Sequence, residues 1–157
     1  MNQPSPEPCF ERILFCTDFA ESADAAFDFA VDIARRRPGS TLCILHVIHE
    51  PEAQFWRSYI SAAEGVDEEA KRAIDAKVAE TYLTRIPAGL PVNVEVRIGP
   101  DAAVILQFAK HARIDLIVLG RLSHGGLEKA LFGGVAEKIV RKASCAVLVV
   151  PLEYARV

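Results

Sequence analysis

The sequence of 157 residues contains little that would mark a metal, membrane or nucleic-acid protein. Its four cysteines, Cys9, Cys16, Cys43 and Cys145, form no CxxC pair and match no zinc-ligand spacing. No apolar run approaches the roughly 20 residues of a transmembrane helix, and the first residues lack the basic-then-apolar order of a secretory signal. The formal net charge of −3 gives no basic footprint for nucleic acid. These absences predict a cytoplasmic protein that binds neither membrane nor nucleic acid.

Motifs of several enzyme classes are also missing. No Gly-Lys-Ser/Thr ends a Walker A loop, no GxGxxG is present, and there is no GxSxG nucleophile elbow. Ser123 and His124 are adjacent, but sequence neighbours rarely face each other as nucleophile and base. No paired carboxylates and no supported Cys–His arrangement complete a catalytic set. We therefore expect no catalytic residue, and at most slow ATP hydrolysis if ATP binds.

Apolar strand-like runs alternate with helical patterns along the chain. Half of the residues (51%) are hydrophobic, which is enough for a folded core. Strands are expected over 13–17, 41–47, 92–98, 116–119 and 146–150, with a helix after each of the first four. This alternation predicts one parallel sheet with helices on both faces. The expected domain spans 13–151, with a flexible tail at 1–12 and a short tail at 152–157.

Two of the expected helices carry specific predictions. The helix after Gly99-Pro100 is expected to begin with Asp101 as its N-cap, because aspartate side chains accept hydrogen bonds from the first free amides of a helix. The last helix is expected to bury the residues that recur at helical spacing, which are Val135, Ala136, Ile139, Val140 and Ala143.

Glycines concentrate between the strand at 116–119 and the last helix. They are Gly120, Gly125, Gly126, Gly133 and Gly134. A glycine-rich turn that leads from a strand to a helix N-terminus brings backbone N–H groups and the positive end of a helix dipole to a ligand, which suits phosphate. The alternative is that the glycines only make a tight crossover. The residues by themselves leave both interpretations open.

The loop resembles that of a known family. In the nucleotide loop of the universal stress protein family, Gly, two residues, Gly, nine residues and Gly are followed by Ser or Thr. Here Gly120, Ser123, Gly133 and Gly134 stand at that spacing. The resemblance therefore assigns the glycine-rich turn to phosphate binding.

The similarity to this family extends over most of the chain. The opening ILFCTDFAESADAAFDFA from Ile13, the segment LCILHVI from Leu42 and the ending AVLVVP all resemble it, so the match runs from Ile13 to Pro151. The resemblance implies an α/β, doubly wound, Rossmann-like sheet of five parallel strands in the order 3-2-1-4-5. It also implies a homodimer built through the C-terminal strand.

The resemblance implies a function as well, a nucleotide-binding regulatory module of the stress response with ATP as ligand, with or without Mg2+. Carried over, the adenine and ribose contacts fall on Thr17, Asp18 and Val47. The phosphate contacts fall on Gly120, Ser123, Gly133 and Gly134, with Val135 beside them and Gly125 adding backbone freedom. Asp18 has a second interpretation, as a carboxylate that stabilises the N-terminus of the first helix.

Two residues depart from the pattern of the ATP-binding members. Ser123 stands where they have glycine, and Gly134 stands where they have a hydroxyl residue. A serine held at positive φ costs roughly 1–2 kcal/mol, and a lost hydroxyl donor costs about 0.5–1.5 kcal/mol. The alternative function is therefore a dimeric interaction protein of the same fold whose loop has lost ATP binding.

Overall fold

The computed structural model describes residues 9–49, 66–121 and 134–152. In chain order, the elements are β1 (Arg12–Thr17), α1 (Glu21–Arg36), β2 (Thr41–Ile48), α3 (Val66–Thr81), the 3-10 helix η1 (Leu83–Arg85), β3 (Val92–Ile98), α4 (Asp101–His111), β4 (Leu116–Arg121), α5 (Gly134–Lys142) and β5 (Ala146–Pro151). No helix in these ranges has the length and apolar character that a membrane span requires.

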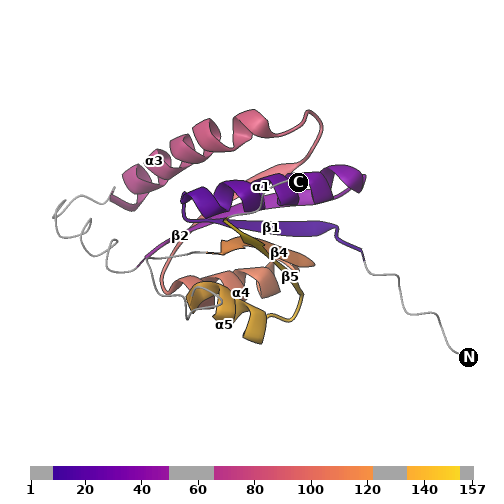
Figure 1. Ribbon diagram of the computed structural model, residues 1–157. Helices are drawn as coiled ribbons and strands as arrows, with labels where there is room; N and C mark the ends of the chain where they lie inside the picture. The colour runs from indigo at the N-terminus through magenta and orange to yellow at the C-terminus, as the bar shows by residue number, and fades with distance from the viewer. Residues whose placement is uncertain (1–8, 50–65, 122–133, 153–157) are drawn as a thin grey trace, which may run out of the picture.

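The five strands form one sheet in the order β3-β2-β1-β4-β5, and every neighbouring pair is parallel. Helices α1 and α3 cover one face of the sheet, and α4 and α5 cover the other (Figure 1). The predicted α/β class, strand order and two-sided covering are therefore confirmed. The order reverses between β1 and β4, and in sheets of this kind ligands bind at that point beyond the carboxyl ends of the strands.

The burial of each strand follows from its place in the sheet. Ile13 to Phe15 of β1 and Leu116 to Leu119 of β4 are buried at successive positions, because helices cover both faces of these inner strands. The edge strand β3 has no fully buried side chain. The apolar run thus marks a central strand and the alternating pattern marks an edge strand, as predicted.

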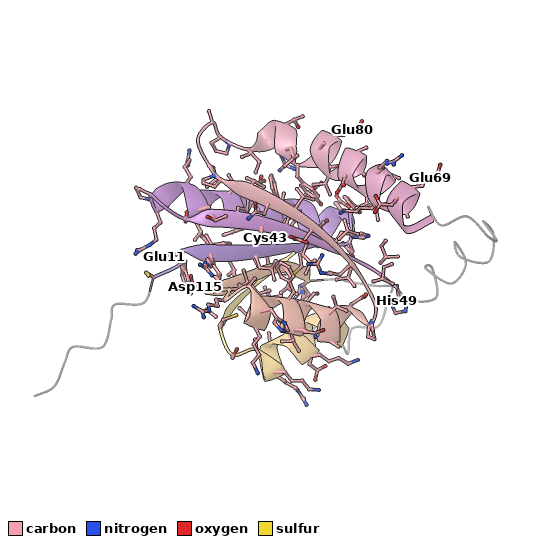
Figure 2. The ribbon with its side chains drawn as sticks, turned by 180° about the vertical axis from the view of Figure 1, so that it is seen from behind. Glu11, Cys43, His49, Glu69, Glu80 and Asp115 are labelled. Carbon is pink, nitrogen blue, oxygen red and sulfur yellow. The ribbon has the colours of Figure 1, made fainter. Side chains whose placement is uncertain are left out.

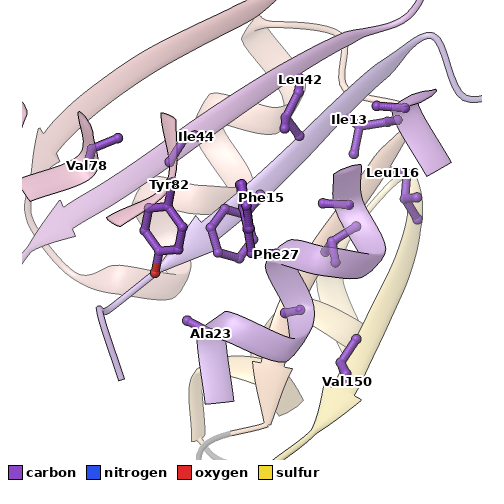
Figure 3. Packing of buried hydrophobic residues seen from close by; sticks show 14 residues of the cluster. Ile13, Phe15, Ala23, Phe27, Leu42, Ile44, Val78, Tyr82, Leu116 and Val150 are labelled. Atoms are coloured by element: carbon purple, nitrogen blue, oxygen red, sulfur yellow. The ribbon is translucent and has the colours of Figure 1, made fainter. Parts of the chain in front are cut away.

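Two cores lie on opposite faces of the sheet. On the α1 and α3 side, Phe15 packs against Phe27 and Tyr82, with ring centroids 5.3 and 5.2 Å apart (Figure 3). On the α4 and α5 side, Leu14 and Ile117 pack with Ile139. Because successive side chains of a strand point to opposite faces of the sheet, neighbouring residues of β1 pack into different cores.

Two predictions about helices are wrong. The N-cap of α4 is Pro100, whose backbone is extended (φ −65°, ψ 122°), and Asp101 is the first helical residue. An N-cap residue has non-helical backbone angles, whereas Asp101 already belongs to the helix, one position after the N-cap. In α5, Ala136 and Ile139 are buried, but Val140 is 48% exposed because it lies one step further around the helix from the sheet.

The two ends of the sheet differ in chemistry. At the amino end, the backbone amides of Glu11 and Arg12 both donate to Asp115 Oδ2, at 3.0 and 2.8 Å, and Figure 2 shows Glu11 and Asp115 together there. His49 lies at the opposite end, beyond the carboxyl terminus of β2. These two hydrogen bonds join the start of β1 to the residue before β4 at the amino end, whereas the cleft lined by Thr17 and Gly120 lies at the carboxyl end.

Candidate functional site

A cleft of about 600 Å³, including its open mouth, lies at the carboxyl ends of β1, β2 and β4. The first turns of α1, α4 and α5 complete its walls. Five of the residues assigned to the site from the sequence line it, namely Thr17, Asp18, Val47, Gly120 and Val135. Ser123, Gly125 and Gly133 lie outside the described residues. Gly134 begins α5, directly before the lining residue Val135.

Thr17 borders the cleft, but its hydroxyl is engaged on the other side of the sheet. Its Oγ1 lies 2.5 Å from the buried Tyr82 hydroxyl and accepts a hydrogen bond from the Phe19 amide at 2.9 Å. The Thr17 carbonyl oxygen lies 2.8 Å from His46 Nδ1, whose ring packs against Phe19. These bonds explain how Phe19 is held at φ 62°, a conformation uncommon for side chains of this size. They fix the turn that presents Asp18.

Asp18 contacts the start of α1 and also lines the cleft. Its Oδ1 accepts a hydrogen bond from the Ala20 amide at 2.9 Å, directly before α1, so the carboxylate shapes the start of that helix. The same side chain is exposed and lines the cleft. A carboxylate can accept several hydrogen bonds at once, so the contact with Ala20 leaves capacity for donors on a ligand.

Gly120 is required by packing, whatever else it contacts. A Cβ at this position would collide with the carbonyl oxygen of Ser22 and lie 2.6 Å from its carbonyl carbon. Since real Cβ atoms do not approach backbone so closely, only glycine lets the first turn of α1 lie against the end of β4. The close approach brings Ser22 and Gly120 together as one wall of the cleft.

The opposite wall is the N-terminus of α5. Val135 and Ala136, in its first turn, line the cleft. The first amides of a helix have no partners inside the helix and lie at the positive end of its dipole. An anionic group at this wall would therefore be stabilised. Gly134 has open space around its Cα, because an added Cβ would meet nothing within 4 Å among the described residues.

Several cleft residues were not identified from the sequence. Leu45, Ile105 and Leu119 give the cleft an apolar floor, and Asp101 adds a second carboxylate at the start of α4. The sequence signal that could have identified Asp101 is its position directly after a strand, because the carboxyl ends of parallel strands meet at one edge of the sheet. Asp101 follows β3 at that edge, but it was interpreted only as a helix cap.

Cys16 also lines the cleft, and its chemistry is suppressed. Burial raises the pKa of its thiol well above the ordinary value, and Cys43 and Cys145 raise it further. A protonated thiol is neither a nucleophile nor a metal ligand. Within the described ranges, no group of three or more His, Cys, Asp or Glu side chains is arranged to hold a metal ion.

The chain is similar to proteins of known family. The family model described as "Universal stress protein family" matches residues 10–151. A universal stress protein of Methanocaldococcus jannaschii is 29% identical over 149 residues, which is 92% of this chain and 84% of that protein. The structure of universal stress protein UspA from Lactobacillus plantarum is 28% identical with a TM-score of 0.70, covering 90% of this chain and 98% of that one.

A further solved structure shares the fold and contains a ligand. It is a universal stress protein in complex with cAMP, 22% identical, with a TM-score of 0.66 over 90% of this chain and 97% of that one. Together, the sheet order and the cleft at the reversal of that order define a doubly wound α/β protein with a cleft where sheets of this kind bind their ligands. The chain belongs to the universal stress protein family.

Proposed function

We propose that this protein is a regulatory module of the stress response that binds ATP, with or without Mg2+. The observation that carries the proposal is the cleft of about 600 Å³, with Asp18 on one wall and the N-terminus of α5 on the other. Sites for small organic ligands are concave and mostly apolar, with a few polar groups that fix the orientation of the ligand. The cAMP complex of a structural relative supports a nucleotide as the ligand class.

Each part of the nucleotide meets suitable chemistry. The apolar floor of Leu45, Ile105 and Leu119 suits the face of a purine ring. Asp18 accepts hydrogen bonds from ribose hydroxyls or the base amine. The first amides of α5 and the positive end of its dipole stabilise the phosphates. The main-chain amides of the loop that precedes α5, including those of Ser123 and Gly133, complete the phosphate site in this proposal.

Gly134 favours a second candidate function, a dimeric interaction protein that no longer binds nucleotide. The residue has no hydroxyl to donate to a phosphate, although it begins the helix that borders the cleft. Under this alternative, the double variant Ser123→Gly with Gly134→Ser gains an affinity for ATP that the unaltered protein lacks. Under our proposal, the unaltered protein already binds ATP and the double variant binds it more tightly.

Thermal unfolding distinguishes these functions. A ligand that binds only the native state stabilises it by about 2.7 kcal/mol at a concentration of 100 Kd, which raises Tm measurably. We expect ATP to raise Tm and inorganic triphosphate to have a much smaller effect, because the nucleoside contacts are missing. No shift for the unaltered protein at several millimolar ATP, with a shift for the double variant, would support the interaction protein instead. If ATP raises the Tm of neither protein, the proposal that this cleft binds nucleotide is rejected.

We also propose a homodimer built through β5. This strand is the outer edge of the sheet next to β4, and Val147 and Val149 are only partly buried in the single chain. Edge strands pair readily with other strands, and lysine on an edge prevents this. Sedimentation velocity should give a dimer for the unaltered protein and a monomer for Val149→Lys. The matched variant Leu83→Lys, at an apolar residue of η1 that is 38% exposed, should remain a dimer.

A further inference from the structure

Asp101 carries an unsatisfied hydrogen-bond acceptor at the cleft. Of the buried side-chain nitrogen and oxygen atoms in the described part of the chain, its Oδ1 is the one that has no hydrogen-bond partner. His49 Nδ1 lies 3.6 Å away, which is close enough for an ion pair but too far for a hydrogen bond. The Asp101 side chain as a whole is 36% exposed, and the residue lines the cleft.

The position of Asp101 in α4 does not explain this burial. A carboxylate in the first turn stabilises the helix through its charge, and it does so equally well with both oxygens in water. The N-cap residue of α4 is Pro100, which has no side-chain hydrogen-bonding group, and Asp101 Oδ1 itself has no partner among the described residues. A buried acceptor without a partner costs about 1–3 kcal/mol. A ligand that brought a donor to Oδ1 would remove that cost.

The charges around the cleft determine which part of a ligand meets Asp101. Asp101 follows β3, on the far side of β1 and β2 from α5. Asp18 lies between them, at the end of β1, so two carboxylates stand on the side away from the α5 N-terminus. Phosphate is repelled by these carboxylates and attracted to the amides of α5. The group that reaches Asp101 is therefore a hydrogen-bond donor without negative charge, which in a nucleotide belongs to the nucleoside end of the molecule.

We infer that Asp101 determines specificity for the nucleoside part of the bound nucleotide, by accepting a hydrogen bond from a base amine or a ribose hydroxyl. The inference rests on the nucleotide-binding function proposed above and adds a residue to it. A site built to accept a hydrogen bond discriminates strongly against an analogue that lacks the donor, because the buried acceptor is then left unpaired.

Calorimetric titration with nucleotide analogues tests this role. The probes are ATP, 2′-deoxyATP, 3′-deoxyATP and purine riboside triphosphate, which lacks only the base amine. The unaltered protein should bind one of the three analogues about tenfold more weakly than ATP, which corresponds to about 1.4 kcal/mol. The variant Asp101→Ala should lose about tenfold for ATP and bind ATP and that analogue equally. Asp101→Asn, whose side-chain oxygen still accepts, should keep part of the preference.

Asp24 provides the matched control. It also lies in the first turn of a helix, with a cation, Arg85 Nη1, at 3.6 Å, but it does not line the cleft. Asp24→Asn should leave all four affinities within about twofold, which is about 0.4 kcal/mol. If Asp101→Ala weakens all four nucleotides equally, weakens them only when Mg2+ is present, or changes none, the inference is overturned while nucleotide binding stands. If the unaltered protein binds none of the four, the proposed function fails and the inference fails with it.

Discussion

Gly120 at the end of β4 lies directly against the Ser22 carbonyl of the first turn of α1. Ser22 is 4% exposed and both residues line the cleft, so this contact sets the position of one wall. A glycine that the sequence pattern assigns to phosphate binding thus has a packing role that is independent of any ligand. The two roles are separable by experiment, because packing is measured without nucleotide.

The first prediction concerns this contact. Gly120→Ala should lower the free energy of unfolding by about 1–3 kcal/mol, since the added Cβ forces backbone to move in a packed interior. Urea denaturation without ligand measures the change. Gly134→Ala is the control, because a Cβ there meets nothing within 4 Å, and it should be neutral or slightly stabilising. Equal effects of the two substitutions would contradict the packing role of Gly120.

The start of α1 offers a stabilising substitution. Its N-cap residue is Ala20, with extended backbone (φ −74°, ψ 161°) and no side-chain capping hydrogen bond. Ala20→Ser should stabilise the protein by about 1 kcal/mol, because a serine hydroxyl at the N-cap accepts a hydrogen bond from a free helix amide. Ala25→Ser, inside the same helix, should be slightly destabilising. A thermal or urea unfolding series in which both serines act alike would argue against the missing cap.

Substitutions at Gly134, the first residue of α5, distinguish an effect of helix propensity from an effect of ligand contact. Gly134→Ser and Gly134→Ala both replace a glycine with a better helix former, but only serine adds a hydroxyl beside the phosphates. Gly134→Ser should raise ATP affinity about threefold to tenfold, as expected for one hydrogen bond of about 0.5–1.5 kcal/mol. Gly134→Ala should leave the affinity nearly unchanged. Calorimetric titration of the two variants measures both ATP affinities. An equal gain in affinity for the alanine variant would show that the serine hydroxyl does not contact the phosphates.

Alkaline stability should depend on the buried thiol of Cys43. Burial raises its pKa to about 12, with Glu95 raising it further and Arg97 lowering it. The unfolded thiol ionises at about 8.5–9, so the folded state binds the extra proton above that pH. Stability from this group is therefore complete below pH 8.5 and falls as the pH rises toward 12.

The variant Cys43→Ala isolates this effect. Under reducing conditions, the difference in unfolding free energy between the unaltered protein and Cys43→Ala should shrink by about 1.5 kcal/mol between pH 8 and pH 10, because only the unaltered protein loses the thiol contribution. Urea denaturation at each pH provides the measurement. Parallel pH profiles for the two proteins would mean that the thiol is as acidic in the fold as in the unfolded chain.

The sequence predicted the sheet well because the strand signal is strong at buried positions. Leu116 to Leu119 is apolar at every residue, and such a run fits a strand covered on both faces. The helix faces were predicted less well. Val140 fits the helical spacing of the apolar residues, yet it is 48% exposed, whereas its neighbour Ile139 is buried. The spacing of apolar residues shows which side of a helix faces the sheet, but the tilt of the helix on the sheet decides how many residues of that side are buried.

Cleft residues were predicted from the sequence where they lie at the ends of strands. They were not predicted where the sequence suggested a different role for the residue. Asp18 and Val47 line the cleft as the carboxyl ends of β1 and β2 require. Asp101 was assigned to a helix cap, and only coordinates show that its Oδ1 is buried and without a partner among the described residues. The apolar floor could not be predicted, since Ile105 and Leu119 look like any other core residues in the sequence.

Isothermal titration of ATP into the unaltered protein tests the central claim most directly. We predict a saturable heat with one nucleotide per chain, which Asp18→Ala weakens by removing the acceptor at the cleft wall. The absence of any heat up to several millimolar ATP, with and without Mg2+, would contradict the account of this cleft as a nucleotide site.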